Sequence, residues 1–374
     1  MIPPIDVTQL SPPAQKIAAA SAPPKLQEMA AKGIAPGVRP ADVVALLVVL
    51  GQSENETVRA TAQATLAKPP DQLLAGALSS DLQPAAIDAL AAACIERRDA
   101  LEKILAMPRI AMETVEDVAR RGSEQVTELI ATNEDRLLKH PRIIEILYLN
   151  KNTRMSTSDR LIDLAARNGV TLTGIHAFKE AAVALQNELI PEASEEPTPD
   201  DVLFRETQEL AEALENAAEG ETDTHEEDEE GNEHIKEQYK GLHQRLADMT
   251  MSQKIRRATL GTREELMLLV RDHNKIIAAA AIRSPKMQES EVTMVSRNRN
   301  ISDEVLRIIG NTPEWLKSYG VKKNLCENPK TPVTIAQRLV QHLRENDLRS
   351  IAKSKNVTGP IKDAARRHLD RRKT

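Results

Sequence analysis

The segment Asn328-Pro329-Lys330-Thr331-Pro332-Val333-Thr334-Ile335-Ala336-Gln337-Arg338-Leu339 carries the strongest fold signal, because a second version lies 178 residues earlier. That version is Asn150-Lys151-Asn152-Thr153-Arg154-Met155-Ser156-Thr157-Ser158-Asp159-Arg160-Leu161, and it repeats Asn, Thr, Arg and Leu in register. The correspondence persists over some ninety positions, with few shifts in offset. An internal repeat of this length predicts two related halves, at roughly residues 83–183 and 260–365.

Short helical runs separated by polar breaks follow one another within each half. The breaks contain Pro or Asn, as in Ser284-Pro285 and Asn311-Thr312-Pro313, and these residues favour helix starts. Ile335, Leu339 and Leu343 form one apolar face at helical spacing. Because runs of ten to fourteen residues are unstable alone, they must bury their apolar faces on neighbouring helices. The sequence therefore predicts an all-α fold, an α-solenoid of short helix pairs in two homologous halves joined by a disordered acidic linker.

The turn at Asn328-Pro329-Lys330-Thr331-Pro332 resembles the Asn-Pro-x-Thr-Pro turn of leucine-rich-repeat-variant and HEAT-like helical repeat proteins. The spacing between successive breaks is less even than in a regular repeat of this kind. The resemblance implies a binding scaffold, and it does not specify a ligand.

Changes in composition divide the chain into four predicted parts. Residues 1–38 are a Pro- and Ala-rich flexible arm, and residues 39–190 are the first helical-repeat domain. Residues 191–234 are an acidic, largely disordered linker, and residues 235–374 are the second, basic helical-repeat domain. Aromatic residues make up only 2% of the chain, which suits closely packed small helices better than a sheet.

Charge is distributed unevenly along the chain. Residues 236–374 contain 29 Lys and Arg against 15 Asp and Glu, whereas residues 191–235 contain 18 acidic residues and one base. Within the acidic part, residues 202–218 form a predicted amphipathic helix with Leu203, Leu210 and Leu214 on one side. Residues 219–233 contain no apolar side chain and are predicted to be disordered by self-repulsion.

No constellation of catalytic or metal-binding residues is evident in the sequence. A Gly-rich phosphate loop, a nucleophile elbow and paired-cysteine metal spacing are all missing, so the chain is predicted to be no enzyme and to use neither cofactor nor metal. Cys94 and Cys326 lie in apolar surroundings, which indicates buried thiols and a reducing cytoplasm. No stretch is long and apolar enough for a membrane span, and no signal peptide is predicted.

The basic end of the chain is the predicted partner-binding face. It consists of Arg344, Arg349, Lys353, Lys355, Lys362, Arg366, Arg367, Arg371, Arg372 and Lys373. Three interpretations remain open: a solubilising cap on the last repeat, docking to an acidic protein or to the chain's own acidic linker, and binding to nucleic acid. The few aromatic residues disfavour single-stranded nucleic acid.

The sequence therefore predicts a non-enzymatic scaffold or adaptor for protein–protein interaction, whose partner carries an acidic patch. The acidic linker is predicted to fold over the basic half and to compete with the partner. The alternative is a HEAT-like protein that binds duplex nucleic acid through its basic C-terminal half.

Overall fold

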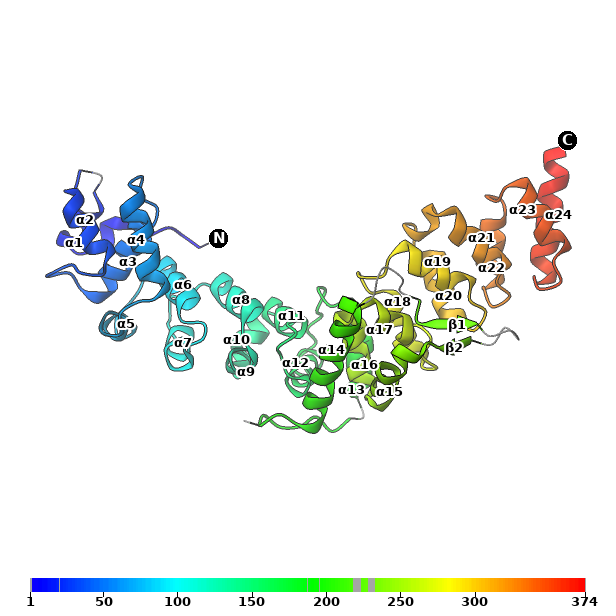
Figure 1. Ribbon diagram of the computed structural model, residues 1–374, viewed down its shortest axis with the longest axis horizontal. Helices are drawn as coiled ribbons and strands as arrows, with labels where there is room; N and C mark the ends of the chain where they lie inside the picture. The colour runs from blue at the N-terminus through cyan, green and yellow to red at the C-terminus, as the bar shows by residue number, and fades with distance from the viewer. Residues whose placement is uncertain are drawn as a thin grey trace. The chain divides into compact units, whose positions relative to one another are not determined.

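The computed structural model describes most of the chain (Figure 1), namely residues 2–19, 21–186, 188–194, 196–217, 223–227 and 233–373. These residues form 24 α-helices, three short 3-10 helices and one two-stranded hairpin, which confirms the predicted all-α class. The chain divides into two compact units, Met1–Leu172 (unit 1) and Thr173–Thr374 (unit 2).

Unit 1 consists of helices only. In chain order these are η1 (Val7–Gln9), α1 (Pro12–Ala18), α2 (Pro24–Ala31), α3 (Pro40–Leu50), α4 (Glu56–Ala67), α5 (Asp71–Leu78), α6 (Pro84–Ala93), α7 (Arg98–Leu105), α8 (Met112–Arg121), α9 (Glu124–Ala131), α10 (Glu134–Lys139), α11 (Arg142–Leu149) and α12 (Met155–Arg167). Most contacts join a helix to the next one or two along the chain, as for α5 with α7, α6 with α8 and α7 with α9.

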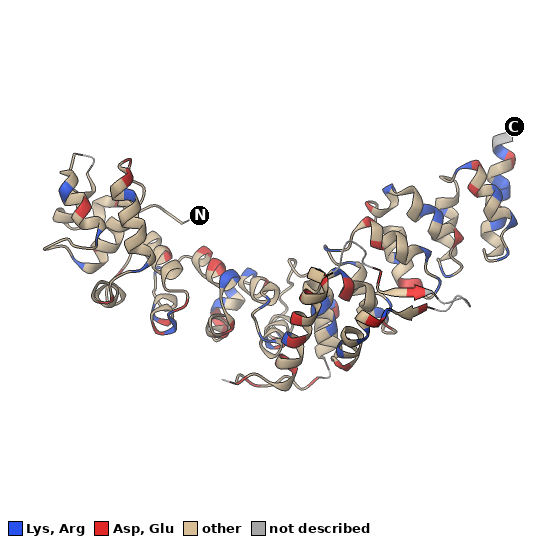
Figure 2. Cartoon of the chain, in the orientation of Figure 1, with Lys and Arg blue, Asp and Glu red and all other residues tan. Residues whose placement is uncertain are grey.

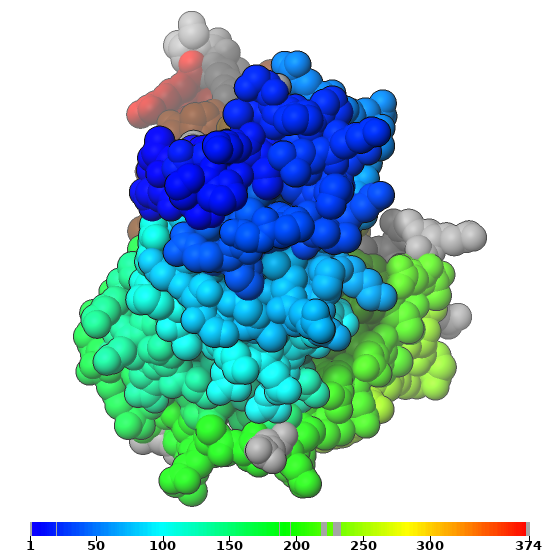
Figure 3. Space-filling model, turned by 90° about the vertical axis from the view of Figure 1, so that its left-hand side faces the viewer, coloured from blue at the N-terminus to red at the C-terminus, as the bar shows by residue number. Residues whose placement is uncertain are grey.

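The N-terminal residues are packed onto unit 1, which differs from the flexible arm predicted for residues 1–38. Helix α1 contacts α3, and α2 contacts both α3 and α4. Leu10, Ala14 and Ile17 are buried. The N-terminal segment (dark blue) forms one continuous surface with the neighbouring part of unit 1 (Figure 3). Of the prolines that suggested a loose arm, Pro12, Pro13 and Pro24 stand in the first turn of α1 or α2, where a missing N–H costs nothing.

The Asn150 turn joins α11 to α12 and is held by its own side chain. Asn150 is 8% exposed, and its Nδ2 donates to the carbonyls of Ala119 at 2.8 Å and Gly122 at 3.1 Å. Its Oδ1 accepts from the backbone N–H of Asn152 at 2.8 Å. The side chain thus satisfies carbonyls at the C-terminal end of α8, which cannot pair within that helix.

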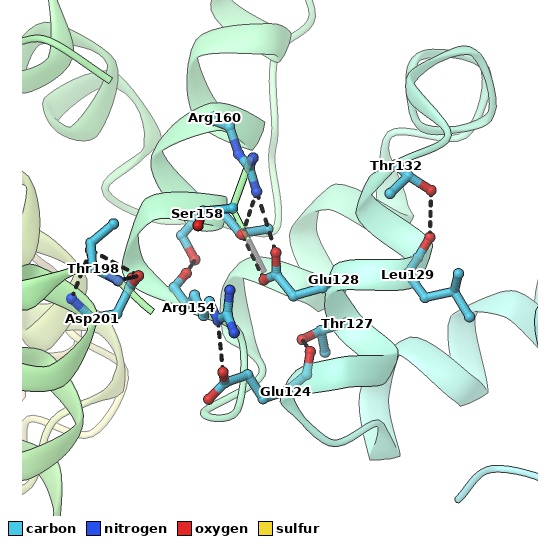
Figure 4. A network of polar contacts seen from close by, with 12 residues as sticks. Glu124, Thr127, Glu128, Leu129, Thr132, Arg154, Ser158, Arg160, Thr198 and Asp201 are labelled. Atoms are coloured by element: carbon cyan, nitrogen blue, oxygen red, sulfur yellow. Dashed lines mark hydrogen bonds and ion pairs between the residues drawn. The ribbon is translucent and has the colours of Figure 1, made fainter. Parts of the chain in front are cut away.

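A polar network joins α9 to α12 within unit 1 (Figure 4). Arg154 donates to Glu124 at 2.7 Å, and Arg160 lies 3.3 Å from Glu128. Thr157 also donates its hydroxyl to Glu128, at 2.6 Å. The acceptors are one helical turn apart on α9, so the network fixes the position of α12 along α9.

The described residues of unit 2 form helices and one hairpin. Its elements are α13 (Phe178–Leu185), α14 (Pro199–Ala217), β1 (His225–Glu227), β2 (Glu233–Ile235), η2 (Glu237–Tyr239), α15 (Lys240–Asp248), α16 (Met251–Leu260), α17 (Arg263–Leu269), α18 (Lys275–Ile282), α19 (Glu289–Arg297), α20 (Asp303–Asn311), η3 (Trp315–Lys317), α21 (Tyr319–Glu327), α22 (Val333–Val340), α23 (Glu345–Lys353) and α24 (Gly359–Lys373). Strands β1 and β2 are antiparallel, with His225 opposite Ile235.

The boundary between the units differs from the predicted division at residues 190 and 234. Helix α13 belongs to unit 2, because it packs on α16 and α18. Within the predicted linker, α14 lies where residues 202–218 were predicted to form a helix, and it packs on α15 and α17 (Figure 1). Most of the acidic run at residues 219–233 lies outside the described residues.

The Asn328 turn of unit 2 has the same hydrogen bonds as the Asn150 turn of unit 1. Asn328 is 6% exposed, and its Nδ2 donates to the carbonyls of Ser296 at 3.1 Å and Asn298 at 2.8 Å, at the C-terminal end of α19. Its Oδ1 accepts from the N–H of Lys330 at 3.0 Å. At both turns the asparagine side chain therefore binds carbonyls at the end of an earlier helix and a backbone N–H of its own turn. This shared role explains why Asn recurs in the repeated segment.

The core consists mainly of Ala, Leu, Ile and Val side chains between helices. Cys94 and Cys326 are both buried free thiols, as predicted. Burial raises the pKa of Cys326 to about 12, and Glu327 acts in the same direction. Burial also raises the pKa of Cys94.

Candidate docking site on unit 2

Metal-binding and membrane-spanning features do not mark a site in the described part of the chain. No group of three or more His, Cys, Asp and Glu side chains there is placed to hold a metal ion. Within the same residues, no helix combines the length and apolar character needed to cross a membrane.

The predicted basic face lies on α23, α24 and the residues next to α23, and its Lys and Arg are most concentrated on α24 (Figure 2). Several of its members already have partners: Arg344 stacks on the Tyr319 ring at 4.7 Å, Arg349 pairs with Glu345 and Arg366 pairs with Asp363. Lys362 is half-buried, whereas the others whose side chains are described are exposed, namely Lys353, Lys355, Arg367 and Arg371. The side chains of Arg372 and Lys373 lie outside the described residues.

The acidic linker predicted at residues 191–234 (here the acidic segment) contacts a different set of arginines, which the sequence did not identify. The ring of Phe204 on α14 lies beside two arginines of α16, with its centroid 4.9 Å from the Arg256 guanidinium carbon and 5.0 Å from that of Arg257. All three side chains are buried. Arg245 on α15 adds an ion pair to Glu206 at 2.7 Å. Helix α14 is thus fixed to unit 2 by an aromatic anchor between cations.

The buried face of α14 differs from the predicted one. Asp201, Phe204, Thr207 and Ala211 are its buried residues, whereas Leu203, Leu210 and Leu214 are half-buried. Phe204 lies on the buried face because its ring, placed beside Arg256 and Arg257 of α16, buries apolar area and makes cation–π contacts. The only sequence signal was the Phe itself, one of two in the chain.

Arg257 is held in place by a buried carboxylate. Its Nε lies 2.7 Å from Glu265 Oε1 and its Nη2 lies 2.6 Å from Glu265 Oε2. Glu265 also accepts from the N–H of Thr262 at 2.7 Å, which closes a capping box at the start of α17. The third guanidinium nitrogen, Nη1, donates to Gln208 of α14 at 3.3 Å. The charge of Arg257 is therefore fully compensated where α14 covers it.

The β1–β2 hairpin lies against a second cluster of polar side chains, after the end of α19. Glu233 of β2 accepts from Asn298 Nδ2 at 2.5 Å and from Asn300 Nδ2 at 3.3 Å. The amide of Asn298 is oriented because its Oδ1 accepts from the N–H of Asn300 at 2.6 Å. The Asn328 side chain holds the carbonyl of Asn298, so the repeated turn positions this cluster.

The hollow between the hairpin and the α19–α20 turn has a volume of about 700 Å³. It is lined mostly by polar and charged side chains, including Arg271, Arg297 and Arg299. Asp223, Glu226 and Glu233 from the hairpin segment also line it. Opposite charges thus meet across the hollow, with the carboxylates supplied chiefly by the acidic segment.

His225 of the hairpin stands next to Arg271 in this hollow. Burial lowers the pKa of His225 to about 4, and the charges of Arg271 and His243 act in the same direction, against Glu233 and Asp223. Its Nδ1 lies 2.9 Å from the Thr224 hydroxyl. The surroundings of His225 in the docked hairpin therefore favour the neutral imidazole.

Comparison with protein-family models, with curated proteins and with solved structures finds no match to this chain.

Proposed function

We propose that this protein is a non-enzymatic helical scaffold that binds partner proteins, with its acidic segment as an internal competitor. In this proposal it is an α-solenoid of two homologous halves, of the HEAT-like or leucine-rich-repeat-variant type. Its place of action is the cytoplasm, where Cys94 and Cys326 remain reduced. Affinity comes from apolar anchors, and charge accelerates the encounter with an acidic partner.

Support for two homologous halves comes from helix starts and turn chemistry. Helix α8 begins at Met112 and α19 at Glu289, an offset of 177, and α12 begins at Met155 and α22 at Val333, an offset of 178. Helix α8 packs on α11 as α19 packs on α21, and α11 packs on α12 as α21 packs on α22. Agreement in helix start and packing partner favours duplication of one ancestral unit.

The observation that carries the proposal is the docking of the acidic segment on unit 2. Its helix α14 places Phe204 against Arg256 and Arg257, and its hairpin places Glu233 against Asn298. The acidic segment thus packs on the rest of unit 2 through one aromatic anchor and several polar and charged contacts. A protein partner with an acidic, aromatic segment would use the same chemistry.

Affinity capture with the full chain tests this function. The tagged protein, immobilised and incubated with lysate of its own organism, is expected to retain the same discrete proteins before and after nuclease treatment. One of these proteins, purified, is expected to co-elute with the full chain in size-exclusion chromatography. Loss of every captured protein on nuclease treatment would contradict the proposal.

A duplex nucleic-acid binder is the second candidate, favoured by the exposed cations of α23, α24 and the turn between them. Lys353, Lys355, Arg367 and Arg371 are exposed, and among the described residues no acidic side chain pairs with them. A gel-shift series with duplex DNA in rising salt decides it, because phosphate contacts weaken steeply with salt. Retardation at low salt that the fourfold Gln variant of these residues loses would support this function, and no retardation would remove it.

A further inference from the structure

The hollow beside the hairpin is cationic once the hairpin's own side chains are set aside. Its lining then holds Arg271, Arg297 and Arg299 against the single carboxylate of Glu327. Amide donors surround them, since Asn298 and Asn300 stand at the end of α19. Guanidinium and amide donors converging on one space are the groups that recognise carboxylates.

The arginine at the base of this hollow is only partly satisfied. The Arg271 side chain is 13% exposed, and its Nη1 donates to the carbonyl of Met267 at 2.8 Å. Its Nη2 lies 3.9 Å from Glu233 and 4.0 Å from Asp223, beyond hydrogen-bond distance, and its Nε is buried without a hydrogen-bond partner among the described residues. The Nε–Nη2 edge, which Arg257 uses to bind Glu265, therefore has no close acceptor at Arg271 among the residues that the structure describes.

The hairpin that covers the hollow is a small element. Each described strand has three residues, and a two-stranded hairpin is at most marginally stable by itself in water. Its docking depends on the contacts of Glu233 with Asn298 and Asn300 and on long-range attraction to Arg271. By contrast, α14 is anchored by the buried Phe204, so the hairpin is the part of the acidic segment that a competitor displaces most easily.

We propose that this hollow is a recognition site for an acidic peptide of a partner protein, and that the hairpin occupies it in cis. The inference rests on the proposed scaffold function and specifies its partner chemistry. A peptide carboxylate takes the place of Glu233 between Asn298 and Asn300, and a second carboxylate approaches the Nε–Nη2 edge of Arg271. The hairpin lowers the affinity for the partner because it competes at a high effective concentration.

The probe is a fluorescein-labelled peptide with the sequence of residues 223–236, titrated with the full chain at low salt and followed by anisotropy. The competing protein variant is D223N/E226Q/E233Q, which keeps the size of the hairpin side chains and removes their charges. It is expected to bind the peptide at least about tenfold more tightly than the unaltered chain, because the competitor in cis is weakened.

Two further substitutions locate the binding in the triple variant. Arg271→Gln is expected to return the affinity to the level of the unaltered chain. Since Arg271 is largely buried, Asn300→Asp serves as a second substitution, because Asn300 is exposed and the new carboxylate repels the peptide. Arg367→Gln removes an exposed charge on α24, outside the hollow, and is expected to leave the affinity unchanged. Circular dichroism spectra verify that each variant is folded.

Three results would overturn the inference. The first is equal binding by the triple variant and the unaltered chain. The second is a loss on Arg367→Gln as large as that on Asn300→Asp, which would indicate general charge attraction. The third is full binding of a peptide that carries Gln in place of Glu233. Lysate capture reports any partner-binding surface and this titration reports only the hollow, so the two proposals fail separately.

Discussion

Arg257 and Glu265 form a bidentate ion pair inside unit 2, with N–O distances of 2.7 and 2.6 Å. The two side chains are 1% and 0% exposed, respectively. Each of these buried charges is stabilised by the other, because removal of one would leave the other buried without a counter-charge. The pair also supports two other features, the capping box of α17 and the covering helix α14, through Thr262 and Gln208. Its loss therefore affects both the core and the docked acidic segment.

Replacement of Glu265 by Gln is expected to lower the free energy of unfolding by about 3–5 kcal/mol, because the Arg257 charge stays buried without a counter-charge. Urea denaturation followed by circular dichroism measures the change. The matched control is Glu345→Gln, which breaks the exposed pair with Arg349 and is expected to cost less than about 1 kcal/mol. Equal losses in the two variants would mean that the buried pair contributes no more than a surface pair.

Replacement of Phe204 by Ala is expected to release α14 and to lower the free energy of unfolding by about 3–5 kcal/mol, through the lost apolar area and the cavity left beside Arg256 and Arg257. Hydrogen–deuterium exchange is expected to show faster exchange in residues 199–217. The adjacent Leu203→Ala is the control, and its half-buried side chain is expected to cost less than about 2 kcal/mol. A larger loss of stability in Leu203→Ala than in Phe204→Ala would mean that α14 packs through the leucine face predicted from the sequence.

Replacement of Asn150 or Asn328 by Ala is expected to lower the free energy of unfolding by about 1–3 kcal/mol each, because buried carbonyls lose their donor. Similar losses are expected in both, since the two side chains make the same kinds of bond. The exposed Asn356 serves as the control, and Asn356→Ala is expected to change stability by less than about 0.5 kcal/mol. Urea denaturation measures all three.

The docked hairpin is expected to loosen as the pH falls from about 6.5 to about 4. The folded-state pKa of His225, about 4, is below its ordinary value, so the released state binds a proton that the docked state excludes. The stabilisation is complete above pH 6.5 and is lost as the pH falls through this window. Hydrogen–deuterium exchange in residues 223–227, corrected for the intrinsic pH dependence, measures the release.

His225→Gln provides the control for this pH dependence. The Gln side chain does not titrate, so exchange in residues 223–227 is expected to vary less between pH 6.5 and pH 5 in this variant. The same pH response in both proteins would assign it to the carboxylates of the hollow rather than to the imidazole.

The helical class and the special role of two turns followed from local signals. Pro and Asn at the breaks predicted short helices, and α3 and α6 begin at Pro40 and Pro84. The in-phase recurrence of Asn150 and Asn328 identified positions that share one pattern of hydrogen bonds. Helix starts are readable because capping depends on residues within a few positions. The carbonyls that Asn150 and Asn328 bind lie 28 to 32 residues away, so the sequence identified the two positions and not their partners.

The behaviour of the acidic and N-terminal segments did not follow from composition. A Pro- and Ala-rich stretch suggested a flexible arm, yet Ala14 and Ile17 are buried. The acidic linker was expected to fold over the basic half, and composition did not single out Arg256, Arg257 and Arg271 of that half as the arginines it meets. Composition reports the average character of a segment, whereas docking depends on single residues such as Phe204.

The sequence alone thus determined that this chain forms short helices and that Asn150 and Asn328 are equivalent positions, because helix starts arise from neighbours along the backbone and the repeat is visible in the residues themselves. Only the tertiary structure decided which face of α14 is buried, which arginines meet it and where Glu233 lies. These contacts join residues 39 to 67 positions apart, from Arg245–Glu206 to Asn300–Glu233. Over such separations, the burial of the Phe204 ring and the pairing of single charges decide which residues contact each other. Neither follows from local periodicity.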